Sequence, residues 1–210
     1  ASADLTNHSL LSQIASTNKP MICSTGMSME TDILEATKLL DDSHARFIFL
    51  HCNSTYPTPF KDVNLNYLDT LKQISKRPVG YSGHERGIFI PVAAVARGAC
   101  IIEKHLTLDR DQEGADHKVS LLPCEMLDLV NNVRAVEDAL GEPNSGRSIT
   151  QGEMLNRETL AKSLVAKDEI RKGEYITAEK VVTRSPGSGL KPSKIGSLLG
   201  KRANRNITAG

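Results

Sequence analysis

Four short apolar runs alternate with helical patterns over the first 140 residues, and this alternation constrains the fold more than any other feature. The runs read PMICS, FIFLHC, PVGYS and ACIIE, at residues 20–24, 47–52, 78–82 and 99–103. Short continuous apolar runs are typical of strands buried on both faces of a parallel sheet, and intervening helices connect such strands. We therefore predict an α/β fold. A doubly wound open sheet is one version of it, but no G-x-G-x-x-G sequence follows any of the runs.

Polar side chains stand where these runs end. His84 and His105 follow the third and fourth runs, and Glu103 alternates with His105 along the same predicted strand. In a (β/α) barrel the strand ends converge on one rim, so these side chains would meet there, with Glu103 and His105 facing the same way. Two neutral imidazoles can hold a divalent metal ion and leave coordination positions open for substrate. Histidines hydrogen-bonded within their own loops are the alternative interpretation.

Serines form a second group near the strand ends. Hydroxyl donors around one rim suit a phosphate or carboxylate better than an apolar ligand. Taken one at a time, each serine is explained as well by the capping of a helix or turn. As a set they indicate an anionic substrate, and the set consists of Ser2, Ser24, Ser54 and Ser82.

Composition excludes several classes of protein. The chain has 39% hydrophobic residues and 26 basic against 25 acidic side chains, which is ordinary for a globular protein. It contains neither an apolar run long enough to span a membrane nor a signal peptide at its start, so we predict a cytoplasmic protein with no membrane partner. Aromatic residues make up 4% and do not interleave with basic residues, which argues against a nucleic-acid partner. The four cysteines show no C-x-x-C spacing, and we interpret them as reduced, structural thiols.

The predicted chain has three parts. Residues 1–142 contain the strand–helix units, and residues 143–160 are rich in Gly, Asn, Ser and other polar residues, as expected of a linker. Residues 161–210 contain short strand-like pieces and form a second, small domain. Residues 181–210 hold six basic residues and no acidic one, which either form a solvated face or attract an anionic substrate. They are Arg184, Lys191, Lys194, Lys201, Arg202 and Arg205.

Six stretches in consistent order along the whole chain resemble the sialic acid synthase family. They read KPMICSTGM, HCNSTYPTPFKDVNL, VGYSGHERG, IIEKHLTLDR, GADHKVSLLP and SLVAKDEIRKGEYIT. The family includes synthases of N-acetylneuraminate, legionaminate and pseudaminate. The resemblance implies the C-terminal half of a (β/α)8 TIM barrel, followed by a small, mostly β antifreeze-like (SAF) domain without its usual C-terminal tail. It implies condensation of phosphoenolpyruvate with an N-acetylated hexose such as N-acetylmannosamine, with release of phosphate.

The resemblance also assigns roles to residues. His84 and His105 match metal-binding histidines, with manganese as the typical ion and Mg²⁺ or Co²⁺ as alternatives, and Glu103 matches the adjacent catalytic carboxylate. In relatives an arginine reaches the N-acetyl region of the sugar from the position of Ser185, one place after Arg184, so the particular sugar is left open. A domain-swapped homodimer is implied, in which each C-terminal domain covers the partner's site and brings Arg184 or Ser185 to the sugar. Phosphoenolpyruvate would contact Ser2, Ser24, Ser54 and Ser82, and the sugar would face Tyr56 and Asp116.

The resemblance covers only the later half of the family's barrel. Because four strands cannot close a barrel, we expect the other strands to lie outside this sequence and this fragment alone to be inactive. Two further functions stay open at this point. One is another metal-dependent aldolase-type barrel enzyme, and the other is a sugar-binding module without catalysis.

Overall fold

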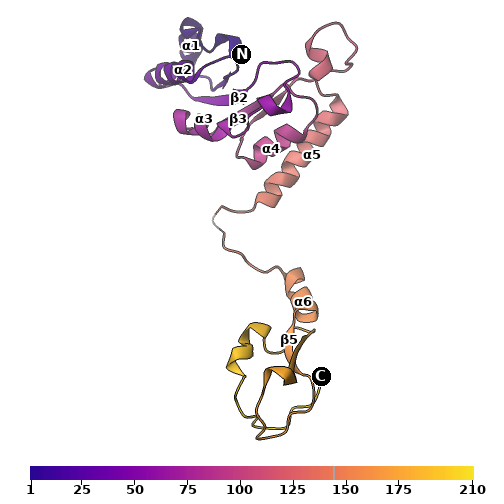
Figure 1. Cartoon of the computed structure of the whole chain (residues 1–210). Coiled ribbons are helices and arrows are strands. Elements are labelled where there is room, and N and C mark those ends of the chain that lie inside the picture. The colour runs from indigo at the N-terminus through magenta and orange to yellow at the C-terminus, as the bar shows by residue number, and fades with distance from the viewer. Residues whose placement is uncertain (144) are drawn as a thin grey trace. The chain divides into compact units, whose positions relative to one another are not determined.

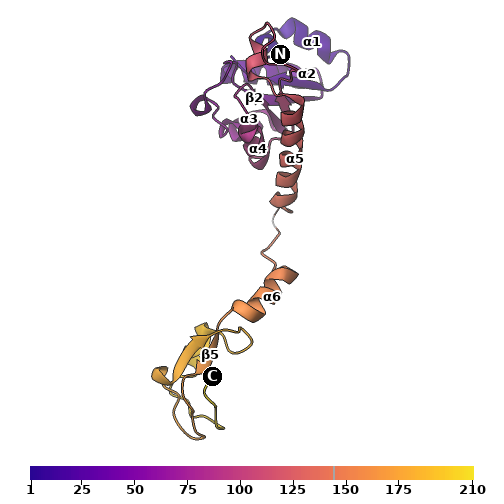
Figure 2. The ribbon, with the colours of Figure 1, turned by 90° about the vertical axis from the view of Figure 1, so that its right-hand side faces the viewer.

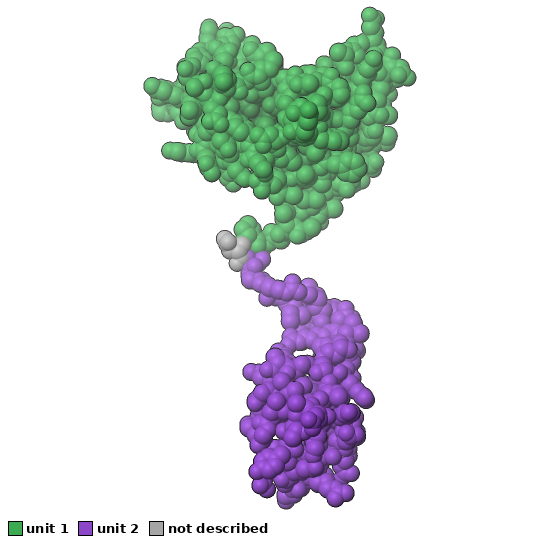
Figure 3. Space-filling view, in the orientation of Figure 1, with its two compact units in different colours: residues 1–143 green, residues 144–210 purple. Residues whose placement is uncertain are grey.

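The computed structural model describes residues 1–143 and 145–210, which form two compact units. The first unit comprises residues 1–143 and the second residues 144–210, coloured separately in Figure 3. Within the described parts of the chain, no helix has both the length and the apolar character needed to cross a membrane.

A parallel four-stranded sheet forms the centre of the first unit. Its strands are β1 (Met21–Ser24), β2 (Phe47–Cys52), β3 (Val79–Gly83) and β4 (Ile102–Lys104), and each pairs with the next along the chain. This consecutive parallel order gives one half of a TIM barrel, and it confirms the predicted fold class. The strands coincide with the four apolar runs to within three residues at either end.

Helices line one side of this sheet (Figures 1 and 2). They are α1 (His8–Ala15), α2 (Glu30–Asp42), α3 (Tyr67–Ser75), α4 (Phe89–Ala96) and α5 (Pro123–Leu140). Short 3-10 helices occupy Ser2–Asp4, Phe60–Asp62 and Asp116–Val119. The helix starts have local causes. For example, the Asp32 carboxylate accepts a 2.7 Å hydrogen bond from the Met29 backbone amide at the start of α2.

The two faces of the sheet carry different side chains. Cys23, Phe49 and Val79 are paired across neighbouring strands and therefore share a face, and all three belong to the core between sheet and helices. On the opposite face, Cys52 pairs with Ser82, and Ser82 with Glu103. The helix-facing side thus holds the apolar core, and the other side carries polar groups at the strand ends.

The second unit is a small β domain. It begins with α6 (Gln151–Leu160) and contains an antiparallel pair, β5 (Ser163–Ala166) and β6 (Val181–Arg184), with 3-10 helices at Ala178–Lys180 and Pro192–Ser197. Its buried core consists of Ile170, Ile176 and Ala203.

The predicted linker, residues 143–160, does not consist of irregular chain throughout, because α6 occupies most of it. Thr150 and Glu153 explain where this helix starts. The Glu153 carboxylate accepts a hydrogen bond from the Thr150 backbone amide at 3.0 Å, and the Thr150 hydroxyl accepts one from the Glu153 backbone amide at 3.3 Å.

Candidate active site

A hollow of about 290 Å³ lies at the C-terminal ends of the four strands. The first residues of the chain border it together with Met27. Eight of the residues singled out from the sequence line this one hollow, although they come from five separate stretches of chain. They are Ser2, Ser24, Ser54, Tyr56, Ser82, His84, Glu103 and His105.

The two histidines lie side by side. Their ring centroids are 5.1 Å apart, with the planes at 85°, and both rings contact that of Tyr56. Nδ1 of the buried His84 lies 2.7 Å from the carbonyl oxygen of Asn53, to which it donates, so Nε2 carries the lone pair. Nε2 accepts a hydrogen bond from the Tyr56 hydroxyl at 3.0 Å. This fixed tautomer is the form in which an imidazole ligates a metal ion.

Carboxylates stand next to the imidazoles. Glu103 Oε1 accepts a 2.7 Å hydrogen bond from the Ser82 hydroxyl, which holds this carboxylate at the edge of the hollow. Asp116 Oδ2 lies 3.8 Å from His105 Nδ1, and its side chain is 62% exposed. The pKa of Tyr56 is raised, first by its burial and then by negative charge at Cys52, Asp116 and Glu103.

The donor set fits a metal ion that takes only part of its coordination from the protein. Among the described residues, no group of three or more His, Cys, Asp or Glu side chains is arranged to hold one. Two adjacent imidazoles, one with its tautomer fixed by a carbonyl, do supply nitrogen ligands of the kind that Mn²⁺, Co²⁺ and Zn²⁺ accept. The remaining positions would then belong to water or substrate oxygens.

Cys52 lies among these groups, although we interpret it from the sequence as a structural thiol only. Its sulfur is 3.6 Å from the Ser2 hydroxyl, 3.9 Å from that of Ser54 and 3.7 Å from His84 Nδ1. Burial alone raises the pKa of this thiol. Hydrogen bonds with His84 and Ser2, the charge of His84 in its protonated form and a hydrogen bond with Ser82 together outweigh burial and lower the pKa. Burial likewise lowers the pKa of His84, while its hydrogen bonds to Cys52 and Asn53 more than offset this and raise it. The chain has no disulfide at any of its four cysteines.

Gly26 is a second residue that sequence reasoning missed. A Cβ atom at this position would lie 2.1 Å from the Ser54 hydroxyl, 2.8 Å from that of Ser2 and 3.1 Å from the Cys52 sulfur. Two hydroxyls can converge here only because residue 26 has no side chain. The available signal is the glycine two residues after the serine that ends β1, in the sequence STGM.

The remaining predicted site residue lies in the other unit. Arg184 ends β6 and pairs with Ser163 in the antiparallel ladder. Next to it, the Ser185 hydroxyl accepts a hydrogen bond from Lys162 Nζ at 2.7 Å and donates to the Leu160 carbonyl at 3.2 Å.

Half of a TIM barrel, with hydroxyls, a carboxylate and paired imidazoles at its C-terminal rim, defines the architecture of a barrel enzyme domain. Comparison with protein-family models makes this specific. Residues 1–145 match the model of the NeuB family, and residues 161–210 match that of the SAF domain. The chain belongs to the NeuB family.

Several relatives of this chain are known. It is 46% identical over 206 residues to an uncharacterized protein of Methanocaldococcus jannaschii, covering 96% of this chain and 60% of that protein. It is 41% identical over 208 residues to the N,N'-diacetyllegionaminic acid synthase of Campylobacter jejuni, and the match covers 98% of this chain and 62% of that protein. The solved N-acetylneuraminic acid synthetase of Leptospira borgpetersenii matches with a TM-score of 0.68 and 38% identity, covering 76% of this chain and 56% of that one. This chain therefore spans less than two thirds of these relatives.

Proposed function

We propose that this chain forms the later half of a barrel enzyme that condenses phosphoenolpyruvate with an N-acetylated hexose and releases phosphate, giving a nonulosonic acid of the sialic acid type. The observation that carries the proposal is the single hollow lined by paired imidazoles, a carboxylate and several serine hydroxyls. The relatives named as nonulosonic acid synthases support the reaction class. An apolar ligand or a binding module without catalysis would not need this set of groups.

His84 and His105 would hold a divalent ion, and we favour Mn²⁺ over Mg²⁺ because nitrogen ligands suit it better. When bound, such an ion supplies Lewis-acid polarisation of a sugar carbonyl oxygen. The Asn53 carbonyl orients the His84 imidazole through its second nitrogen, and the Asp116 carboxylate lies 3.8 Å from Nδ1 of His105. Tyr56, whose hydroxyl now donates to His84, would turn this donor toward a sugar oxygen.

The serines would bind the acidic donor substrate. The hydroxyl of Ser24 has no hydrogen-bond partner within the described chain and lies at the hollow, so it is available to a phosphate or carboxylate oxygen. Ser2, Ser54 and Ser82 contribute further hydroxyls. Glu103, held by Ser82, is the group that would accept a proton from water or from a sugar hydroxyl.

A swapped homodimer would complete this site. We propose that the SAF unit covers the hollow of a partner subunit, where Arg184 or Ser185 would reach the sugar and exclude water. In a catalytically active protein that contains this chain, mixing a His105→Ala variant with one that lacks residues 161–210 tests this arrangement, because a hybrid dimer contains one intact site. Regained activity is the expected result, and none, with hybrid formation shown independently, would contradict the swap.

The reaction itself can be tested in a catalytically active protein that contains this chain. Incubation with phosphoenolpyruvate, Mn²⁺ and a panel of N-acetylated hexoses should release inorganic phosphate only when an acceptor sugar is present. Phosphate release that does not depend on the sugar, or retention of phosphate in the product, would contradict the proposed chemistry and favour another aldolase-type reaction.

A further inference from the structure

A fully buried ion pair lies just behind the two histidines. Glu85 and Lys104 have side-chain exposures of 0% and 1%, and Lys104 Nζ lies 3.1 Å from Glu85 Oε1. The ammonium group also donates to the backbone carbonyl of Glu85. The second carboxylate oxygen, Oε2, accepts the Tyr81 hydroxyl at 2.6 Å. Every charged atom of the pair therefore has a partner.

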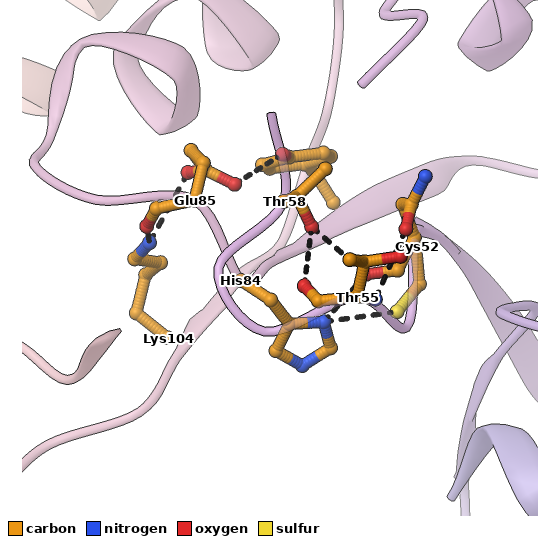
Figure 4. A network of polar contacts seen from close by, with 8 residues as sticks. Cys52, Thr55, Thr58, His84, Glu85 and Lys104 are labelled. Carbon is orange, nitrogen blue, oxygen red and sulfur yellow. Dashed lines mark hydrogen bonds and ion pairs between the residues drawn. The ribbon is translucent and has the colours of Figure 1, made fainter. Parts of the chain in front are cut away.

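The Glu85–Lys104 pair is adjacent in sequence to both candidate metal ligands. Glu85 directly follows His84, and Lys104 directly precedes His105. The pair thus joins the residues that adjoin the two proposed ligands, one on the loop after β3 and the other at the end of β4. Figure 4 shows Glu85 and Lys104 meeting each other, with the imidazole of His84 directed away from them toward Cys52.

The backbone around the pair is shaped to accept it. Gly83 pairs with Lys104 in the sheet, and a Cβ atom on Gly83 would lie 2.7 and 2.8 Å from the two Glu85 carboxylate oxygens. Any residue other than glycine would displace this carboxylate. Within five residues, the sequence YSGHE therefore supplies the hydroxyl of Tyr81, the space left by Gly83 and the carboxylate of Glu85. The candidate metal ligand His84 stands between Gly83 and Glu85.

Stability does not account for such a pair. Removing two charges from water costs several kcal/mol each, and well-packed apolar residues of similar size are often as stabilising as a buried ion pair or more so. What the pair does provide is a defined distance between two chain segments, because each of the two groups forms an ion pair with only the other one among the residues that the structure describes. A positional role is the explanation that its location favours.

We propose that the Glu85–Lys104 pair, held by Tyr81 and accommodated by Gly83, sets the separation of His84 and His105 and so prepares them to bind one divalent ion. Glu85 and Lys104 are positioning residues, since neither lines the hollow. This inference rests on the proposed metal site. It adds to that site a supporting layer on the helix-facing side of the sheet, of the kind that usually affects metal affinity by about 10- to 100-fold when removed.

Metal binding by the full chain tests the inference without reference to turnover. Mn²⁺ affinity is measured by electron paramagnetic resonance, and the visible spectrum of bound Co²⁺ reports ligand geometry. Glu85→Gln is expected to lower Mn²⁺ affinity about 10- to 100-fold and to alter the Co²⁺ spectrum of folded protein. The double variant Glu85→Gln/Lys104→Met should recover part of the affinity, because the single variant leaves a buried ammonium without its counter-charge.

Two controls separate the outcomes. Asp41→Asn removes the acid of the exposed pair between Arg77 and Asp41 and should leave Mn²⁺ affinity unchanged. If Glu85→Gln does not fold, Lys104→Arg keeps the charge with a different reach, and it should fold and bind Mn²⁺ more weakly.

Unchanged affinity and spectrum in folded Glu85→Gln or Lys104→Arg protein, with only a lower melting temperature, would overturn the positioning role. His84→Ala distinguishes this failure from a failure of the proposed site. If wild-type Mn²⁺ binding is the same in His84→Ala, then the metal site and this inference both fail. If binding is lost in His84→Ala but unaffected by Glu85→Gln, only the positioning role fails.

Discussion

The two faces of the four-stranded sheet in the first unit differ in burial and in chemistry. The helix-facing side is closed and apolar, and Phe49 at its centre is 0% exposed. The opposite side is open, with Ile22 55% exposed, and carries hydroxyls and a carboxylate toward the ends of its strands. Because alternate residues of a strand point to opposite faces, one short segment such as FIFLHC serves both sides at once.

This difference shows how the fold separates stability from chemistry. Packing on the helix-facing side fixes where each strand ends, and the strand ends in turn fix where the polar groups stand. Substitutions on the open side should therefore affect binding and turnover with little change in folding, and substitutions on the closed side should do the reverse. The Glu85–Lys104 pair is the informative exception, since it lies behind the site and is proposed to act on it.

The largest effect is expected at His105. In a catalytically active protein that contains this chain, His105→Ala should reduce turnover by roughly a thousandfold or more, because the proposed metal ion would supply several kcal/mol of transition-state stabilisation. The free energy of unfolding should change little, since the ring lies at the rim and is partly exposed. Steady-state kinetics and urea denaturation measure the two quantities. His8→Ala, at the start of α1, is the matched control, and equal activity in both variants would contradict a ligand role.

The closed face should show the opposite response. Phe49→Ala removes a fully buried ring from the core and should lower the free energy of unfolding of the first unit by about 3 to 5 kcal/mol. Folded molecules should still bind Mn²⁺ with wild-type affinity. Denaturation followed by circular dichroism, together with Mn²⁺ titration, tests both statements. Ile170→Ala is the control, because it truncates the separate core of the second unit.

A smaller effect on binding is expected at Gly26. In Gly26→Ala the new methyl group would occupy the space of the Ser54 and Ser2 hydroxyls, which must then move away. Loss of two hydrogen bonds to a charged ligand should weaken phosphoenolpyruvate binding by roughly tenfold to a hundredfold. Calorimetric titration measures this affinity. Gly152→Ala, where an added Cβ meets no atom within 4 Å, is the control, and unaltered binding in both would argue against a substrate role for these serines.

Sequence reasoning predicted the strand ends and the residues there, because an apolar run followed by a polar side chain is a local pattern. It could not find the roles of Cys52 and Gly26, which come from contacts with Ser2 and Ser54 on other segments. The ion pair of Glu85 with Lys104 was missed for the same reason. Helix α6 was different, since its T-x-x-E capping sequence was visible at Thr150 but stood within a stretch of linker-like composition.

The smallest effect concerns pH and returns to the closed face. His51 is buried there and donates from Nε2 to the Val63 carbonyl at 2.6 Å. Burial lowers the pKa of His51, and the hydrogen bonds to the backbone of Val63 and Asn64 only partly offset this. Below the ordinary histidine pKa of about 6.5, the unfolded chain therefore takes up a proton that the folded chain does not.

It follows that His51 contributes stability above about pH 6.5 and that this contribution is lost as pH falls toward its folded pKa, with a slope of at most about 1.4 kcal/mol per pH unit. His51→Gln keeps an N–H donor but cannot titrate, so its unfolding free energy should fall less than that of the wild type between about pH 7 and pH 5. Urea denaturation across this range measures the difference. His84, whose raised pKa acts in the opposite direction, is present in both proteins and cancels. Parallel pH profiles would mean that His51 titrates alike in the folded and unfolded chain, and that this part of the closed face admits water.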